Sequence, residues 1–206
     1  MSSLNREAAQ GFAPVVAAAA ALALWPVASQ AHHLMDLSVQ QTPNGLSGLM
    51  SGLAHPLLGP DHLLFLLALG LVGLRESRGW MLALLTTGLV ASGLGCWLPG
   101  LPGAETLVAL SLVVLGLVLC GRLPRWTLLP AFALHGYVLS ASVIGWEATP
   151  LLAYGVGLLL SQAILLSLSL GVVRVWSQRL AIPQLRLCAG LLMGMGAAFA
   201  WTTLVP

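Results

Sequence analysis

Two histidines and an aspartate that could bind a metal ion lie in one short segment, HPLLGPDH, at residues 55–62. Neutral imidazole nitrogens and carboxylate oxygens are ligands that suit nickel, cobalt, zinc and copper. The segment stands at the head of an apolar run, residues 63–74. An Asp in the middle of a spanning helix costs roughly 2.5–3.5 kcal/mol. Because ionisable groups are costly in such a place, their retention there favours a functional role.

The backbone between the two histidines is expected to break. In one straight helix His55 and His62 would share a face but stand roughly 10 Å apart along the axis, too far to bind one ion together. Proline removes a backbone donor and clashes with the carbonyl four residues before it, yet it suits the first position of a helix. We therefore predict a broken or re-entrant turn at Gly59-Pro60 that folds His55 back towards Asp61 and His62.

Further candidate ligands lie elsewhere in the chain. Glu105 is predicted at the outer end of the third spanning helix and His135 near the middle of the fourth, so the ligands would form an access route from the outer surface towards the midplane. Simpler interpretations stay open: Asp61 as a helix N-cap, Glu105 as a carboxylate favoured in a first helical turn, and the histidines as hydrogen-bonded core residues. Other candidates are His32 and His33, and, more weakly, Glu147 and Gln162.

Composition indicates an integral membrane protein. Of the 206 residues, 58% are hydrophobic and only 7% are charged, whereas soluble domains carry about 25% charged residues. The formal net charge of +2 forms no basic patch, so the expected partners are the lipid bilayer and a divalent metal ion, and not nucleic acid. Three scattered cysteines show no metal-type spacing. Homo-oligomerisation is left open.

Residues 1–31 are predicted to be a secretory signal peptide. A basic residue is followed by a short apolar stretch, residues 12–25, and then by small residues at Ser29 and Ala31. Cleavage after Ala31 would leave two histidines at the mature amino terminus. Cleavage after Ser29 would place His32 third, where the amine, backbone amides and imidazole could chelate a divalent ion. The alternative is an uncleaved first transmembrane helix.

The mature chain, residues 32–206, is predicted to be one all-α membrane helix bundle with six transmembrane helices, or seven if the signal is uncleaved. Residues 32–51 are polar enough to lie outside. With the mature amino terminus outside the inner (plasma) membrane, every Arg falls on the cytoplasmic side, as the positive-inside rule requires. The predicted spans cover residues 55–74, 80–97, 104–120, 126–144, 150–175 and 187–204.

These residues resemble a known family. The string His-Pro-x-x-Gly-x-Asp-His, followed by Gly70 in an apolar span, is similar to the signature of the HupE/UreJ family of small nickel or cobalt permeases. A signal ending just before a His, six mature helices, Glu105 ahead of Ala-Leu-Ser, and Phe-Ala-Leu-His135-Gly all agree with it. The resemblance covers residues 31–204.

The resemblance implies a metal site built on the first mature helix. The chain differs from the family pattern in the fourth helix, where residues 137–140 lack the second His that often follows His-Gly. It also lacks a His that is frequently expected in the fifth helix. The metal-site residues that the resemblance implies are His55, Asp61 and His62, with Glu105 and His135 in support.

The function predicted on this basis is secondary transport. The chain is expected to import Ni²⁺ or Co²⁺ as its transported substrate, with no permanently bound cofactor and no enzymatic activity. It carries no Gly-Lys-Ser/Thr loop for ATP hydrolysis. One alternative is a metal-binding accessory or sensor protein of hydrogenase, urease or cobalamin metabolism that does not transport. Another is an intramembrane hydrolase that pairs Ser92 with His135.

Overall fold

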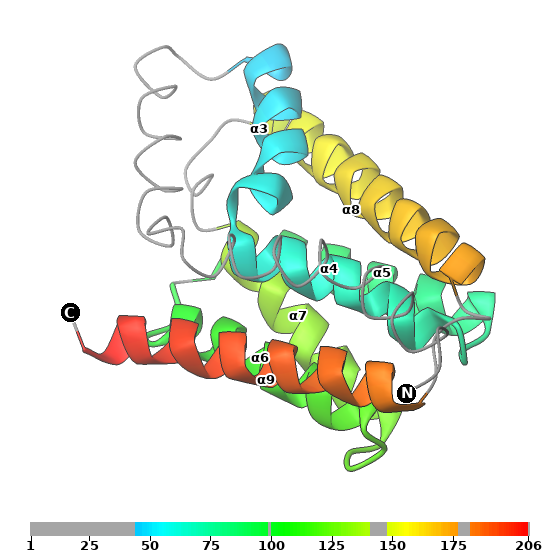
Figure 1. Ribbon diagram of the computed structural model, residues 1–206. Helices are drawn as coiled ribbons and strands as arrows, with labels where there is room; N and C mark the ends of the chain where they lie inside the picture. Colours follow the sequence, from blue (N-terminus) through cyan, green and yellow to red (C-terminus); the bar gives the residue numbers. More distant parts are fainter. Residues whose placement is uncertain (1–43, 99, 141–147, 177–181, 206) are drawn as a thin grey trace.

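The computed structural model describes residues 44–98, 100–140, 148–176 and 182–205, and within these ranges the chain forms helices and turns without a β-strand (Figure 1). The predicted signal peptide, with His32 and His33 after it, lies outside the described residues. The elements are α3 (Gly45–Leu58), α4 (Pro60–Gly73), α5 (Arg78–Gly95), α6 (Ala104–Leu119), the 3-10 turn η1 (Arg125–Thr127), α7 (Leu128–Leu139), α8 (Ala148–Trp176) and α9 (Ile182–Leu204).

Several of these helices are suited to a bilayer. Helices α8 and α9 are each long and apolar enough to cross a membrane, and α3 and α4 pass the same test together as one span bent by 76°. Helix α6 is apolar but shorter. Large apolar side chains on α8, among them Leu152, Ile164 and Leu168, are more than half exposed, as expected for a lipid-facing surface. The protein is therefore an all-α membrane protein.

The predicted break between the two histidines is confirmed. Gly59 has an extended backbone (φ −85°, ψ 109°) and lies between the end of α3 and the start of α4. Pro60 occupies the first turn of α4, where its missing N–H costs nothing. His55 thus lies in the last turn of α3, and His62 lies in the first turn of α4.

Helix α3 begins ahead of the predicted first span, so residues 45–51 of the predicted outside segment, residues 32–51, are helical. Asn44 caps this helix, since its Oδ1 accepts from Ser47 N at 2.9 Å and Ser47 Oγ accepts from Asn44 N at 2.8 Å. Gly48 lies directly against the Pro150 carbonyl of α8, where any Cβ would overlap it. Capping and this close helix contact override the polar character of the segment.

The other boundaries agree closely with the predicted spans, with two differences. Helix α9 begins at Ile182, ahead of the predicted start at residue 187. Helix α7 ends at Leu139, and the end of the predicted fourth span, residues 141–144, lies outside the described residues, as does Glu147.

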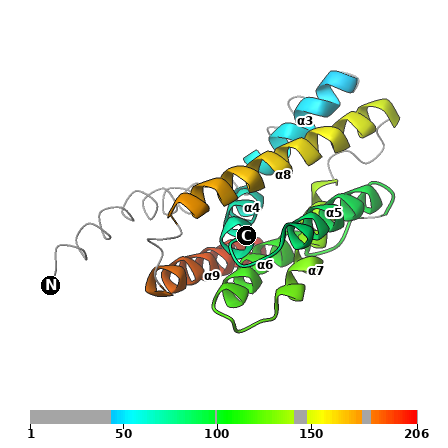
Figure 2. The same ribbon diagram turned by 90° about the vertical axis from the view of Figure 1, so that its right-hand side faces the viewer.

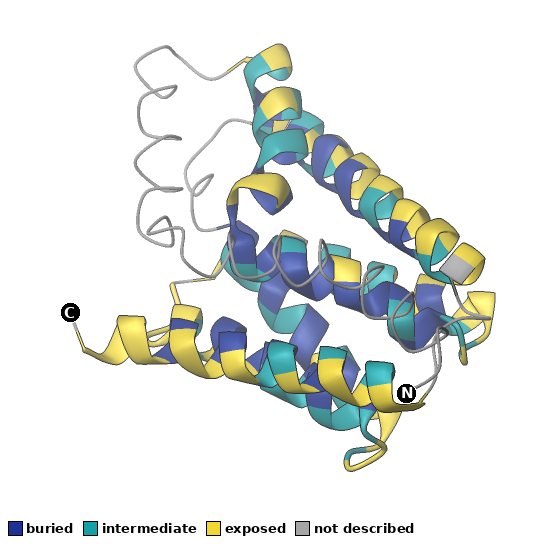
Figure 3. Ribbon diagram, in the orientation of Figure 1, coloured by how far each residue is buried: buried dark blue, intermediate teal, exposed yellow. Residues whose placement is uncertain are grey.

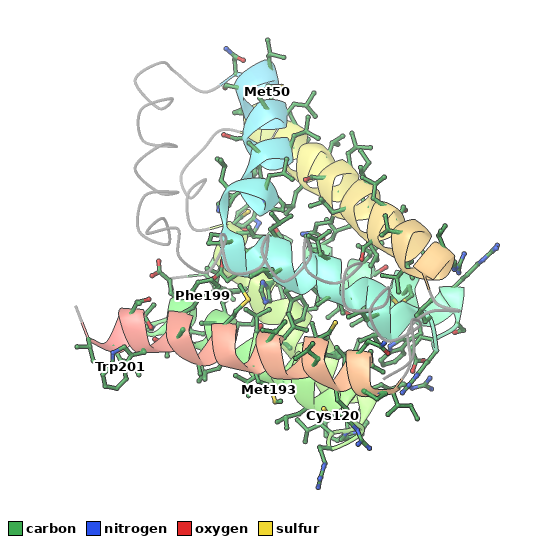
Figure 4. All side chains as sticks on the ribbon, viewed as in Figure 1. Met50, Cys120, Met193, Phe199 and Trp201 are labelled. Atoms are coloured by element: carbon green, nitrogen blue, oxygen red, sulfur yellow. The ribbon has the colours of Figure 1, made fainter. Side chains whose placement is uncertain are left out.

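The helices pack in pairs around α4. Figures 1 and 2 show α3 beside α8 and α6 beside α9, while α5 packs on α7. Ten of the fourteen residues of α4 are buried, and Figure 3 shows this burial continuing onto α7. Phe65 of α4 stacks on Phe132 of α7 with ring centroids 5.8 Å apart. On α9, Phe199 lies towards the bundle and Trp201 away from it (Figure 4). The core is thus the meeting point of α4, α6 and α7.

Candidate metal centre

Two histidines meet in this core. The Nδ1 atoms of His62 on α4 and His135 on α7 lie 2.6 Å apart, and their ring centroids lie 4.8 Å apart. Both side chains are buried, with relative exposures of 7% and 2%. Phe65 stacks on the His135 ring at 4.2 Å. The pair therefore lies among apolar groups, where imidazole is costly unless it is hydrogen-bonded or binds a ligand.

Ser111 on α6 fixes the chemical state of His135. Its Oγ lies 2.6 Å from the Val108 carbonyl and 2.6 Å from Nε2 of His135. A carbonyl can only accept, so the single hydroxyl proton of Ser111 goes to Val108, and Ser111 must accept from His135 Nε2–H. It follows that His135 carries its lone pair on Nδ1, which faces His62. Such partners commonly orient metal-binding imidazoles.

The same reasoning assigns the proton between the imidazoles. Because Nδ1 of His135 is the acceptor, Nδ1 of His62 donates. One cation bound to both Nδ1 atoms would replace this hydrogen bond. Metal–nitrogen bonds of the length known for zinc would place the two atoms about 3 Å apart. The rings would therefore have to move apart and turn so that both lone pairs face the ion, with the His62 proton moved to its other nitrogen.

His55 is oriented by a second hydroxyl. Tyr154 of α8 donates a short hydrogen bond to the Leu139 carbonyl, so its oxygen accepts from Nδ1 of His55 at 3.1 Å. The lone pair of His55 is then on Nε2. The rings of His55 and His62 lie edge to face with centroids 6.3 Å apart. Three imidazoles thus follow one another from α3 through α4 to α7.

Two acidic residues share a cavity with His55 and His62. The cavity, of about 50 Å³, is lined by His55, Asp61, His62 and Glu105 together with apolar groups and Thr203. This volume admits a few water molecules. Asp61 lies in the first turn of α4 and its Oδ1 accepts from the His62 backbone N at 2.8 Å. The N-cap position belongs to Gly59, so interpreting Asp61 as the N-cap is wrong.

A larger cavity adjoins this one. It measures about 400 Å³ and lies between the end of α5, the start of α6, α7 and α9. Glu105, Val138 and Thr203 line both cavities. The carboxylate of Glu105 is therefore placed at the boundary between the larger cavity and the imidazole-lined one.

The structure thus brings His55, Asp61, His62 and Glu105 around one cavity, with His135 in contact with His62. Across the described ranges, no three His, Cys, Asp or Glu side chains form a ready-made metal cluster. The arrangement is an imidazole pair with a third imidazole and two acidic residues nearby.

Sequence reasoning missed the two orienting hydroxyls, Ser111 and Tyr154. Ser111 belongs to the Ala-Leu-Ser string that follows Glu105, which was the available signal; nothing in the sequence pattern singles out Tyr154. The suggested pairing of Ser92 with His135 is wrong, because Ser92 Oγ lies 2.7 Å from Ser140 Oγ. Nor does Ser111 act as an activated nucleophile, since His135 donates to it and does not take its proton.

The fold and the site define a helical membrane protein with an imidazole-rich core. The sequence matches the family model described as HupE / UreJ protein over residues 19–199, so the chain belongs to this family. Its members are permease-like or accessory proteins associated with nickel or cobalt uptake, and they are not enzymes. Neither the curated proteins nor the solved structures contain a match.

Proposed function

We propose that this protein is a secondary permease that imports Ni²⁺ or Co²⁺ across the inner membrane. The observation that carries the proposal is the buried contact between His62 and His135, whose Nδ1 atoms lie 2.6 Å apart within the helical core. Ionisable groups within spanning helices are expensive and mark ion pathways. Neutral imidazoles with nearby carboxylates suit both metals.

The route of the ion follows the two cavities. A hydrated cation enters the larger one and meets Glu105, whose carboxylate attracts it and accepts hydrogen bonds from its water shell. In the smaller cavity Asp61 and the imidazole of His55 replace some of those waters. The ion then separates the His62–His135 pair and binds between the rings. Its dehydration is thereby spread over several steps.

The proposed topology has six spans after a cleaved signal, residues 1–31, with the mature amino terminus outside. His32 and His33 would then collect ions at the outer surface. In support, Arg125 forms an ion pair with Glu76 and lies over the Trp80 ring at 4.9 Å. These contacts bring the segments that follow α4 and α6 to one side of the bundle, the side that is cytoplasmic under the positive-inside rule.

Uptake of radioactive Ni²⁺ and Co²⁺ by cells that express the protein tests the proposal. We expect uptake by the wild type to exceed that of His62→Ala, His135→Ala and Asp61→Asn by about tenfold, as loss of a ligand or its supporting group commonly costs. Thr86→Ala is the control, because its hydroxyl is exposed and donates to the Leu82 carbonyl of its own helix. Equal uptake in all strains would overturn the proposal. Metal binding without uptake would indicate an accessory or sensor protein instead.

A further inference from the structure

The side chain of Gln162 is a buried amide with an unusual environment. It is fully buried, with a relative exposure of 0%. Among the residues that the structure describes, neither its Oε1 nor its Nε2 has a hydrogen-bond partner. Buried polar groups are nearly always hydrogen-bonded, and an exception requires an explanation. An amide in a membrane protein core that serves packing alone would be replaced at a gain in stability by an apolar residue of its size.

Gln162 is the middle residue of α8. Ser169, seven residues further on and about 20° away around the helix axis, donates to the Leu67 carbonyl of α4. Tyr154, eight residues before Gln162, contacts His55 of α3. Gln162 lies between them, about 12 Å from Tyr154 and about 10 Å from Ser169 along the helix axis. Helix α8 is therefore attached to both halves of the bent span, with Gln162 between the two attachments.

Figure 1 shows how α8 lies relative to the bent span. Helices α3, α4 and α8 form three sides of a triangle in this view, and the corner between α3 and α4 is the 76° bend at Gly59. Gln162 is midway along the opposite side and on its buried face. His55 and His62 stand on either side of that corner. Gln162 is thus a fully buried residue at the middle of the helix that contacts both halves of the bent span.

We propose that Oε1 of Gln162 is an oxygen ligand for the divalent cation after it leaves the imidazole pair; this inference rests on the proposed transport function. An amide oxygen is a neutral ligand of hard and borderline cations and binds them less tightly than a carboxylate does. Its Nε2 can at the same time donate a hydrogen bond to an anion or to a side-chain acceptor. A weak ligand at this point suits conduction, which requires that the ion also leave.

The test uses the full-length protein in proteoliposomes, with Ni²⁺ flux and the thermal unfolding midpoint measured on each variant. We expect Gln162→Leu to lower the flux by about tenfold while its Tm stays equal to or above that of the wild type, because no hydrogen bond is lost. Ser169→Ala is the matched control on the same helix face. It removes the bond to Leu67, so its Tm should fall while its flux stays within about twofold of the wild type.

Gln162→Glu gives a second readout without transport. A carboxylate at this position should raise the Ni²⁺ affinity of the detergent-purified protein by about fivefold or more, because it adds charge to an oxygen ligand. The proposal is overturned if Gln162→Leu transports as the wild type does, if it loses flux together with Tm or does not fold, or if Gln162→Glu binds no more tightly.

These outcomes are separable from failure of the proposed function. If the wild type itself carries no Ni²⁺ flux, or if His62→Ala carries as much, then the permease proposal fails. If the wild type transports and His62→Ala does not, a normal flux in Gln162→Leu removes only the role of Gln162.

Discussion

His62 and His135 lie 73 positions apart in the sequence and meet Nδ1 to Nδ1 at 2.6 Å. Their contact is the last link of a hydrogen-bonded series that starts at the Val108 carbonyl and passes through Ser111. The series joins α6, α7 and α4 in the core. The direction of each hydrogen bond determines the direction of the next. A substitution at Ser111 should therefore alter the proton positions and orientation of the His62–His135 pair.

Replacing Ser111 should weaken metal binding without removing a ligand. In Ser111→Ala, His135 loses the acceptor for its Nε2–H and no longer holds Nδ1 towards His62. Loss of such an orienting partner lowers metal affinity by about 10- to 100-fold. Titration of the purified protein with Ni²⁺ measures this, and Ser111→Thr, which keeps the hydroxyl, is the control. Wild-type affinity in the alanine variant would show that Ser111 does not orient His135.

A methyl group at Gly59 should disturb the site directly. A Cβ there would lie 2.7 Å from Cδ2 of His62, so the imidazole must move. We expect Gly59→Ala to lose about tenfold or more in Ni²⁺ affinity, through displacement of one ligand. Gly155→Ala, whose added Cβ meets nothing within 4 Å, serves as the control and should bind normally. Similar affinities in the two variants would contradict the geometry at the bend.

Tyr154→Phe should cost stability. The hydroxyl satisfies both the Leu139 carbonyl and Nδ1 of His55, all of them buried. Leaving such groups unpaired costs about 1–3 kcal/mol. Thermal unfolding in detergent should show a lower midpoint for Tyr154→Phe, and Ni²⁺ binding should weaken as His55 loses its orientation. A midpoint equal to that of the wild type would mean that water replaces the hydroxyl.

The predicted signal peptide can be tested by the mass of the protein isolated from membranes. Cleavage after Ala31 gives a chain that begins with His32, and cleavage after Ser29 gives one that begins with Gln30. Either cleavage would place His32 and His33 within the first four residues of the mature chain. The mass of the full 206-residue chain would contradict the prediction and favour an additional amino-terminal transmembrane helix.

The local features of the site could be predicted because they depend on nearby residues. Gly59 and Pro60 restrict their own backbone and that of their neighbours, and the break follows from this alone. The apolar runs likewise indicate the helices. Helix α3 was missed at residues 45–51 because its cap at Asn44 and its contact with α8 are not visible in hydropathy.

The contacts between helices could not be predicted in the same way. No periodicity brings Ser111 to His135 or Tyr154 to His55, since these pairs depend on how α6, α7 and α8 are rotated against one another. Gln162 was recognised as polar and near the middle of a span. That it has no hydrogen-bond partner within the described part of the chain became visible only with the packing around it.

The most direct measurement of the central claim is X-ray absorption at the metal edge of the Ni²⁺-loaded protein. The proposed site predicts nitrogen or oxygen neighbours at about 2.1 Å and outer-shell scattering from at least two imidazoles, with one imidazole fewer in His135→Ala. A wild-type spectrum without imidazole scattering, or one that is unchanged in His135→Ala, would contradict it.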